Sequence, residues 1–157
     1  MKQLIPASFS DFEFFYKIKK EDKNMKWTGH TEKPVKKKLQ EWFVNKLTDG
    51  SDRKIYIYFI NEVPVGYSYA IYETNYIETA VAISKEFEGF GYGTEMVIET
   101  LNLLKDEGKQ IIAWIFDENM ASIKLHQNAG YIATEKQKKF DEVLKMTMYS
   151  YPNLNRK

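Results

Sequence analysis

Glu88-Gly89-Phe90-Gly91-Tyr92-Gly93-Thr94 is the stretch of this sequence that decides the fold. Its three glycines alternate with aromatic residues, between a β-branched run at 77–83 and a helix-forming run at 95–104. This order predicts a strand, a glycine-rich loop and a helix. Glycine lets backbone N–H groups approach a ligand closely, and the first helical turn adds unsatisfied N–H donors and a partial positive charge. The stretch therefore indicates either a phosphate site or a turn that only packs the helix on a sheet.

Two common phosphate-binding motifs are disfavoured. A P-loop requires Gly-Lys-Ser or Gly-Lys-Thr, and neither tripeptide occurs in the chain. A dinucleotide fingerprint spaces its glycines differently and places an acidic residue about 20 positions later. Here Ala113-Trp114 occupies the place of that acid.

A second segment, 119–131, follows the apolar run at 110–116 and narrows the choice. With it the chain resembles the GNAT family of N-acetyltransferases. The family's acetyl-CoA loop reads Gln or Arg, two residues, Gly, one residue, then Gly or Ala; 88–93 matches, except that Glu88 stands where Gln or Arg is usual. The family's next block contains an Asn, a Ser, a Tyr and a Gly-Phe pair. The matching positions hold Asn119, Ser122, His126 and Gly130-Tyr131, so histidine replaces the tyrosine.

The resemblance implies an α/β (α+β) fold with a mixed, mostly antiparallel twisted sheet flanked by helices. The expected order is β-α-α-β-β-β-α-β-α-β-β with splayed central strands, in one domain over 1–157. Hydrophobic period and turn residues predict the same order. They give strands at 2–5, 54–60, 63–73, 76–83, 110–116, 131–134 and 143–149, and helices at 8–20, 34–49, 95–104 and 120–129.

Composition excludes several classes. The chain has 157 residues with 43% hydrophobic and 29% charged content, which fits one globular domain. Its formal net charge of +1 gives no field that favours nucleic acid, and no apolar run is long enough to cross a membrane. The absence of cysteine fits a reducing, cytoplasmic location and excludes a cysteine nucleophile. His30 and His126 lie far apart in sequence, so no metal site is expected.

The resemblance assigns acetyl-CoA as the co-substrate. The loop should hold its pyrophosphate, and the backbone of the fourth strand should pair with pantetheine. Asn119 either contacts pantetheine or only caps a helix, and Ser122 either reaches the phosphates or supports the helix start. The expected cofactor-binding residues are Ala82, Ile83, Ser84, Glu88, Gly89, Phe90, Gly91, Tyr92, Gly93, Thr94, Asn119 and Ser122.

Acetyl transfer requires a neutral amine, a donor for the oxyanion and a proton or hydrogen bond for the leaving thiolate. Because cysteine is absent, direct attack in a ternary complex is expected. His126 is the candidate acid, and the alternative is a histidine that only packs in its helix. Glu78 is the candidate base, directly or through water, and the alternative is a polar strand residue.

The sequence specifies the residues of the acceptor pocket less well than those of the acetyl-CoA site. Aromatic residues beside a carboxylate suit a cationic amine, although the same residues suit ordinary packing. The expected substrate-binding residues are Trp27, His30, Tyr72, Glu73 and Tyr76, with Phe140 nearby. A small-molecule amine, an amino acid or an aminoglycoside-like compound is the first expectation for the acceptor, and a protein N-terminus is the second.

Two other classes stay open. The departures at Glu88 and His126 also suit a CoA-binding sensor with little catalysis, and the loop alone suits a protein that binds ATP or NAD. Edge strands and the aromatic-rich ending at 146–151 leave a homodimer open.

Overall fold

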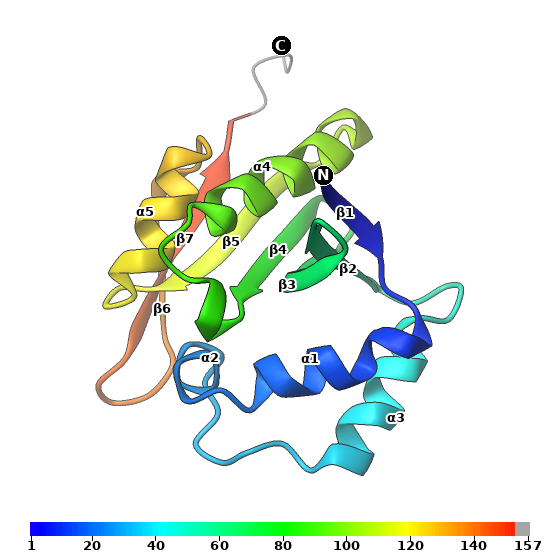
Figure 1. The fold of residues 1–157 in the computed structure, drawn as a ribbon. Coiled ribbons are helices and arrows are strands. Elements are labelled where there is room, and N and C mark those ends of the chain that lie inside the picture. Colours follow the sequence, from blue (N-terminus) through cyan, green and yellow to red (C-terminus); the bar gives the residue numbers. More distant parts are fainter. Residues whose placement is uncertain (153–157) are drawn as a thin grey trace.

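The computed structural model describes residues 1–152. Its centre is a sheet of seven strands in the order β1-β2-β3-β4-β5-β7-β6, in which neighbours are antiparallel except β4 and β5 (Figure 1). The strands are β1 (Lys2–Pro6), β2 (Arg53–Ile60), β3 (Val63–Tyr72), β4 (Tyr76–Ile83), β5 (Gln110–Phe116), β6 (Ile132–Lys139) and β7 (Lys145–Tyr151).

Helices cover both faces of the sheet. On one face lie α1 (Phe12–Lys19), α2 (Asp22–Trp27) and α3 (Lys36–Lys46), and on the other α4 (Tyr92–Leu104) and α5 (Met120–Asn128). Successive strand residues point to opposite faces, so alternate residues enter separate cores. Ile55 and Tyr69 pack with Phe15 of α1, whereas Ile77 and Ile111 pack with Leu101 of α4.

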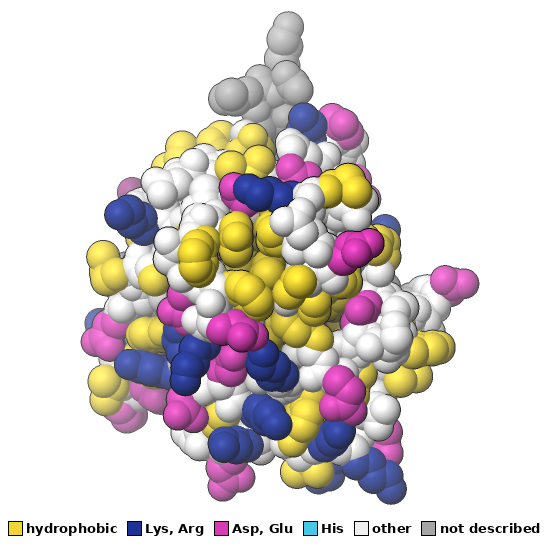
Figure 2. Space-filling view, viewed as in Figure 1, with side chains coloured by type: hydrophobic (Ala, Val, Ile, Leu, Met, Phe, Trp, Pro, Cys, Tyr) yellow, Lys and Arg dark blue, Asp and Glu magenta, His cyan; other side chains and the backbone are white. Residues whose placement is uncertain are grey.

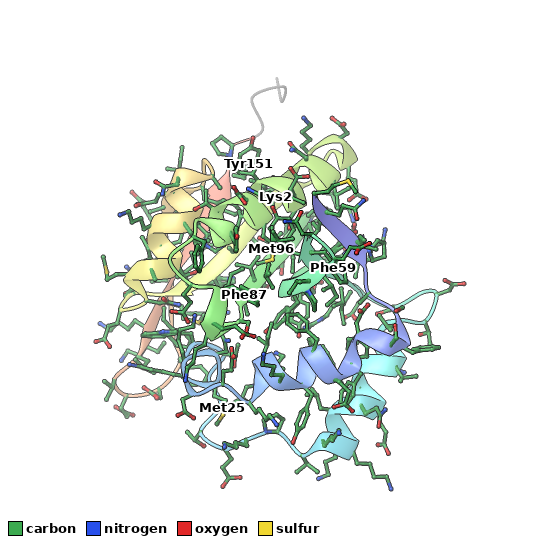
Figure 3. The ribbon with its side chains drawn as sticks, viewed as in Figure 1. Lys2, Met25, Phe59, Phe87, Met96 and Tyr151 are labelled. Atoms are coloured by element: carbon green, nitrogen blue, oxygen red, sulfur yellow. The ribbon has the colours of Figure 1, made fainter. Side chains whose placement is uncertain are left out.

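A third cluster lies where α4 meets the edge of the sheet. Met96 of α4 points towards the strands and packs with Tyr58 and Val65 (Figure 3). Figure 2 shows hydrophobic side chains gathered between α4 and α1, with charged side chains below them. Ile83 and Phe87 pack on this cluster from the segment that leads into the glycine loop. The loop is therefore anchored on both sides by apolar packing.

The strands β4 and β5 separate partway along their length. Their register runs only from Tyr76 opposite Gln110 to Glu78 opposite Ile112. At the point of separation the Thr79 hydroxyl lies 3.3 Å from the Ile112 carbonyl oxygen and 2.6 Å from the Tyr131 hydroxyl. These side chains replace the backbone ladder, and beyond them the sheet opens.

The predicted fold, including the splayed central strands, is confirmed. Three details of the sequence prediction are wrong. Residues 22–27 form α2, which is too short for an amphipathic repeat to reveal. The sixth strand extends to Lys139 instead of Thr134, because it is an exposed edge strand whose polar sequence pairs with β7. The helix predicted at 34–49 is shorter and spans Lys36–Lys46.

Candidate active site

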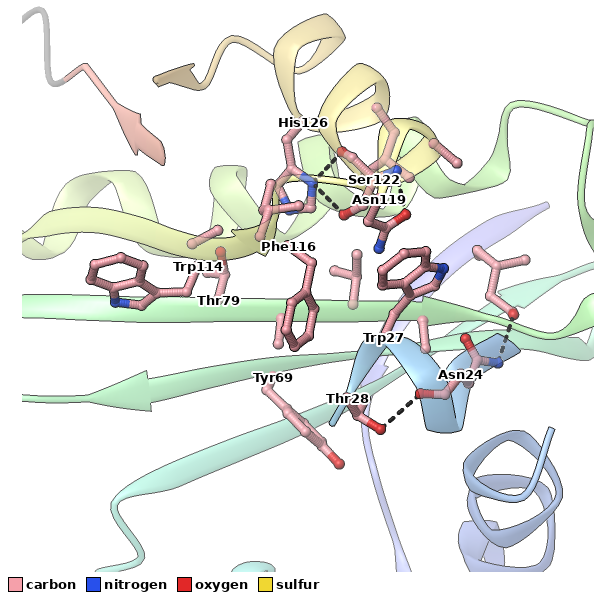
Figure 4. A pocket seen from close by; sticks show the side chains of 18 of the residues that line it. Asn24, Trp27, Thr28, Tyr69, Thr79, Trp114, Phe116, Asn119, Ser122 and His126 are labelled. Atoms are coloured by element: carbon pink, nitrogen blue, oxygen red, sulfur yellow. Dashed lines mark hydrogen bonds between the residues drawn. The ribbon is translucent and has the colours of Figure 1, made fainter. Parts of the chain in front are cut away.

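The separation of β4 and β5 opens a cavity of about 190 Å³ (Figure 4). Its walls come from β3, β4 and β5, with α2 on one side of the sheet and α5 on the other. The lining residues are Lys23, Asn24, Trp27, Thr28, Tyr67, Tyr69, Thr79, Ala80, Val81, Ala82, Ile83, Ala113, Trp114, Ile115, Phe116, Asn119, Ala121, Ser122, Leu125 and His126. The cavity therefore connects the two faces of the sheet at one point.

The backbone of β4 offers hydrogen bonds to this cavity at alternate residues. The N–H of Ser84 donates to the Val65 oxygen at 2.8 Å, so this end of the antiparallel β3–β4 pair is hydrogen-bonded. Because bonded and non-bonded pairs alternate, Ala82 also faces β3, whereas Val81 and Ile83 face the opening. Of the three positions predicted for pantetheine, Ala82 and Ser84 therefore direct their backbone groups to β3, whereas Ile83, like Val81, directs them to the opening. The role of the three positions stays a prediction.

The glycine loop has the backbone that only glycine adopts readily. Gly89 and Gly91 have φ values of 84° and 80°, and a Cβ at either position would meet open space. Gly91 caps α4, and the first bond of that helix runs from Glu95 N–H to the Gly91 oxygen at 3.2 Å. The N–H groups of Tyr92, Gly93 and Thr94 precede that bond, so they can donate to an anion. Phe90 stacks on Tyr92 at 5.5 Å between ring centroids.

The charge of Glu88, beside this candidate anion site, is paired in the structure. Its carboxylate forms an ion pair with Lys23 of α2. Lys17 pairs with Glu86 at 2.5 Å, and the Lys85 N–H donates to the Glu21 carboxylate at 3.0 Å. The turn between α1 and α2 thus holds the segment before the glycine loop.

His126 is buried, with 2% of its surface exposed. Its Nδ1 lies 2.8 Å from the Ser122 carbonyl oxygen, and since a carbonyl only accepts, Nδ1 carries the proton. Burial lowers the pKa of His126, against the opposing effect of this hydrogen bond. Nε2 is buried without a partner among the described residues, and in the neutral ring it can only accept. This arrangement does not supply the donor that the acid role requires.

Asn119 and Ser122 both line the cavity. The Asn119 Oδ1 accepts from the Ser122 N–H at 3.3 Å, so Asn119 caps α5 as its residue type favours. The cap leaves the Asn119 amide N–H₂ available as a donor. The Ser122 hydroxyl lies 3.3 Å from the protonated Nδ1 of His126, so its own proton is also available.

Glu78 is the last residue of β4 that pairs with β5, so it lies next to the opening. It does not line the cavity itself. Burial raises its pKa, the charges of Lys138 and Arg53 oppose that rise, and Glu73 adds to it. A carboxylate whose proton affinity is raised in this way suits general base catalysis.

The side of the cavity that faces α1 and α2 is aromatic. Trp27, as predicted, lines the cavity, and its ring lies 5.9 Å from that of Phe116. His30 lies outside it, among the residues of two neighbouring cavities. Phe140 packs edge-on against Phe116 at 5.3 Å and supports the wall from behind.

The other three predicted acceptor residues lie elsewhere. The Glu73 N–H donates to the Tyr76 oxygen at 2.9 Å, and the Tyr72 hydroxyl donates to Glu107 at 2.9 Å. All three lie at the turn between β3 and β4. That turn is at the closed end of β4, because β4 and β5 diverge only towards Ile83. The structure therefore places Tyr72, Glu73 and Tyr76 away from this cavity, and their role as acceptor residues stays a prediction.

The comparison with family models decides the identity. The model described as the acetyltransferase (GNAT) family matches residues 12–131. The chain belongs to the GNAT family of acetyltransferases. This GNAT acetyltransferase is an enzyme that uses acetyl-CoA, and the open glycine loop and the divergent strands fit that co-substrate.

Solved structures show the same fold at low sequence identity. An aminoglycoside acetyltransferase in complex with ribostamycin and coenzyme A has a TM-score of 0.82 and 18% identity, over 99% of this chain and 98% of that one. Spermidine N-acetyltransferase from Vibrio cholerae, in complex with CoA and spermine, has a TM-score of 0.81 and 13% identity, over 96% and 95%. The comparison with curated proteins found no match.

Sequence reasoning about this GNAT acetyltransferase missed the aromatic wall and Asn24. Tyr67 and Tyr69 on β3, and Trp114 and Phe116 on β5, are spaced by two, which places each pair on one face of the sheet. That signal is visible in the sequence. The contact of Asn24 with β4 is not visible in the sequence. Its side-chain amide donates to the Ile83 carbonyl oxygen at 3.3 Å, and the two residues are 59 positions apart.

Two features are absent from residues 1–152. No helix there is long and apolar enough to cross a membrane. Nor does that part of the chain bring together three or more His, Cys, Asp or Glu residues that could hold a metal ion.

Proposed function

We propose that this enzyme transfers the acetyl group of acetyl-CoA directly to a primary amine of a small molecule, in a ternary complex. The observation that carries the proposal is the cavity between β4 and β5, which joins the face of the glycine loop to the aromatic face. A thioester and an amine that approach from opposite faces can meet there. Ribostamycin and spermine, in the two similar structures, are themselves amines of small molecules.

Each group of the site has one task in this proposal. The N–H groups of 92–94 hold the pyrophosphate, and the backbone of Val81 and Ile83 pairs with pantetheine. Glu78 takes the proton of the amine, directly or through water. The Asn119 amide and the Ser122 hydroxyl face the cavity with free protons, so they stabilise the developing oxyanion or the leaving thiolate.

The decisive experiment is an acceptor screen. The protein is mixed with acetyl-CoA and a panel of small amines, and free thiol is measured over time. A peptide panel with free N-termini tests the alternative of N-terminal acetylation. Thiol release that depends on a small amine supports the proposal, and release with peptides alone contradicts it.

A CoA-binding sensor is the second candidate, because a neutral His126 replaces the family's tyrosine and Glu88 replaces its glutamine or arginine. Calorimetric titration with acetyl-CoA separates the two functions. Tight binding without thiol release from any acceptor identifies a sensor.

We also infer a cytoplasmic location from the absence of cysteine, and we leave the homodimer as a prediction. Gel filtration and light scattering test the oligomeric state.

A further inference from the structure

Two cations surround a tyrosine of the aromatic wall. The Lys19 Nζ lies 5.3 Å from the ring centroids of both Tyr67 and Tyr69. The Arg53 Cζ lies 5.0 Å from the ring of Tyr69 and 5.2 Å from the ring of Trp42. Both tyrosines line the active-site cavity. Positive charge is thus concentrated behind the wall on which the acceptor packs.

These groups have hydrogen-bonding capacity that the described residues leave unused. The Arg53 Nε and the Tyr69 hydroxyl are both buried and without a hydrogen-bond partner, and Tyr69 as a whole is only 4% exposed. Within residues 1–152, neither Arg53 nor Lys19 has an ion-pair partner within 4.0 Å. Buried polar groups are nearly always satisfied, so an unpartnered pair indicates a ligand.

The space beside them is large enough for a ligand group. Arg53 and Lys19 line a second cavity of about 380 Å³, together with His30, Glu32, Pro34, Leu39 and Trp42. Glu32 is its only carboxylate among the described residues and is exposed to solvent. The neighbouring Asp52 is already paired with Lys46 at 2.9 Å. The net charge of this cavity is therefore positive.

The active-site cavity itself offers little to a polycation. Among the described residues that line it, only Lys23 is charged. Glu78 lies next to the opening and on the same face as Arg53, since Ile71 of β3 pairs with both residues. Two strand spacings, about 10 Å, separate their backbones. One carboxylate and one guanidinium on a shared face are complementary to a molecule that carries both an amine and an acid.

We propose that the acceptor is an amino acid or another amine that bears a carboxylate. Arg53, with Lys19 and the Tyr69 hydroxyl, binds the carboxylate, and Glu78 faces the amine. The planar guanidinium lies against the rings of both Trp42 and Tyr69, so it is held ready for two parallel hydrogen bonds to a carboxylate. This inference rests on the proposed function and specifies its substrate class.

Matched acceptors test it. L-phenylalanine, L-methionine and L-leucine are compared with their amides and with the corresponding decarboxylated amines, by thiol release from acetyl-CoA. We expect the carboxylates to have the lowest KM. Arg53→Gln should raise that KM about 10- to 100-fold, as for a lost hydrogen bond to a charged group. The KM of the decarboxylated amines and the affinity for acetyl-CoA should stay unchanged.

Two further variants keep the test independent of folding. Tyr69→Phe keeps the ring and removes only the hydroxyl, and it should raise the KM of the carboxylates in the same selective way. Lys54→Met is the matched control, because Lys54 lies 5.3 Å from the ring of Tyr72, at the closed end of β4, and it should change nothing. Thermal melts by circular dichroism report whether each variant folds.

The outcomes are distinguishable. If amides and decarboxylated amines are acetylated as well as the carboxylates, or if Arg53→Gln weakens all of them equally, the inference is wrong and the proposed function stands. If no amine releases thiol although acetyl-CoA binds, the proposed function is wrong and this inference with it.

Discussion

His126 shows how a single residue changes meaning once its surroundings are known. In the sequence it occupies the place of a tyrosine that would donate a proton. In the structure its Nδ1–H is held by the Ser122 oxygen, and burial disfavours its charged form. Chemistry at this position therefore requires another donor, and Asn119 and Ser122 are the ones that face the cavity.

The pKa of His126 should lie below 6.5, the ordinary value for histidine. Because the unfolded chain binds this proton more tightly, the free energy of unfolding should fall as pH drops from about 6.5 through the folded-state pKa. NMR titration of the imidazole resonances measures the pKa directly, and a His30→Gln variant assigns the two histidines. A midpoint at or above 6.5 contradicts the neutral ring and restores the acid role.

The effect of Glu78 on the pH dependence of stability has the opposite sign to that of His126. Since burial raises its pKa, the folded state favours the protonated form, and stability is lost as pH rises through the folded-state pKa. Glu78→Gln should therefore leave the protein at least as stable at pH 7 while lowering kcat/KM about 10²- to 10⁴-fold. Thermal melts and the pH–rate profile are the measurements. An unchanged profile returns Glu78 to an ordinary strand residue.

At the scale of elements, the loop before α4 has to combine a left-handed backbone with open space. Gly91 and Gly50 offer a matched pair, with φ values of 80° and 82° and no atom within 4 Å of the place that a Cβ would take at either position. Valine at either site should destabilise the protein by about 1–2 kcal/mol, because a β-branched residue avoids the left-handed region.

Of these two variants, Gly91→Val should abolish the binding of acetyl-CoA, because Gly91 lies in the loop that we propose to hold the pyrophosphate and Gly50 does not. Calorimetric titration of both variants checks this. Equal affinity in the wild-type protein and Gly91→Val removes the loop from the site.

The junction of β4 and β5 depends on side chains. Burial raises the pKa of Tyr131, so its hydroxyl stays protonated and can donate to Thr79, which donates to the Ile112 oxygen. Thr79→Val preserves the shape but leaves a buried hydroxyl without a partner, so it should cost about 1–3 kcal/mol. In urea denaturation the double variant Thr79→Val/Tyr131→Phe should be less destabilised than the sum of the single variants. Additive losses show that the two hydroxyls are not coupled.

At the scale of the whole molecule, ligand binding should stabilise the fold as a unit. The site draws residues from α2, β3, β4, β5, α4 and α5, so acetyl-CoA binds the folded chain alone. At a concentration 100 times its Kd it should add about 2.7 kcal/mol of stability. For a domain of this size that raises Tm by about 5–11 °C.

Scanning calorimetry with acetyl-CoA, ATP and NAD compares the ligand classes at equal concentration. A larger shift with ATP or NAD than with acetyl-CoA identifies a nucleotide-binding protein instead.

The sequence by itself determined the order of the elements, the glycine loop and the family resemblance, because these depend on local period and on short motifs. The glycines at 89 and 91 predicted a loop with positive φ, and the structure has it. The residue type of Trp27 suggests an acceptor site, and Trp27 does line the cavity. What local patterns could not show is where β4 leaves β5, and therefore that Tyr72, Glu73 and Tyr76 lie at the closed end of β4.

The tertiary structure alone decided which residues of β4 direct their backbone groups to the opening. It also decided which ring nitrogen of His126 carries the proton, and it brought Arg53 and Lys19 close to the ring of Tyr69. Each of these features depends on contacts between atoms that the sequence pattern does not specify. Ser84 must pair with Val65 before Val81 and Ile83 can face the opening. Arg53 reaches Tyr69 only because β2 lies beside β3. The direction of a hydrogen bond and the protonation state of a side chain depend on the atoms around it in space. A sequence pattern specifies only the face of the strand or helix on which a residue lies.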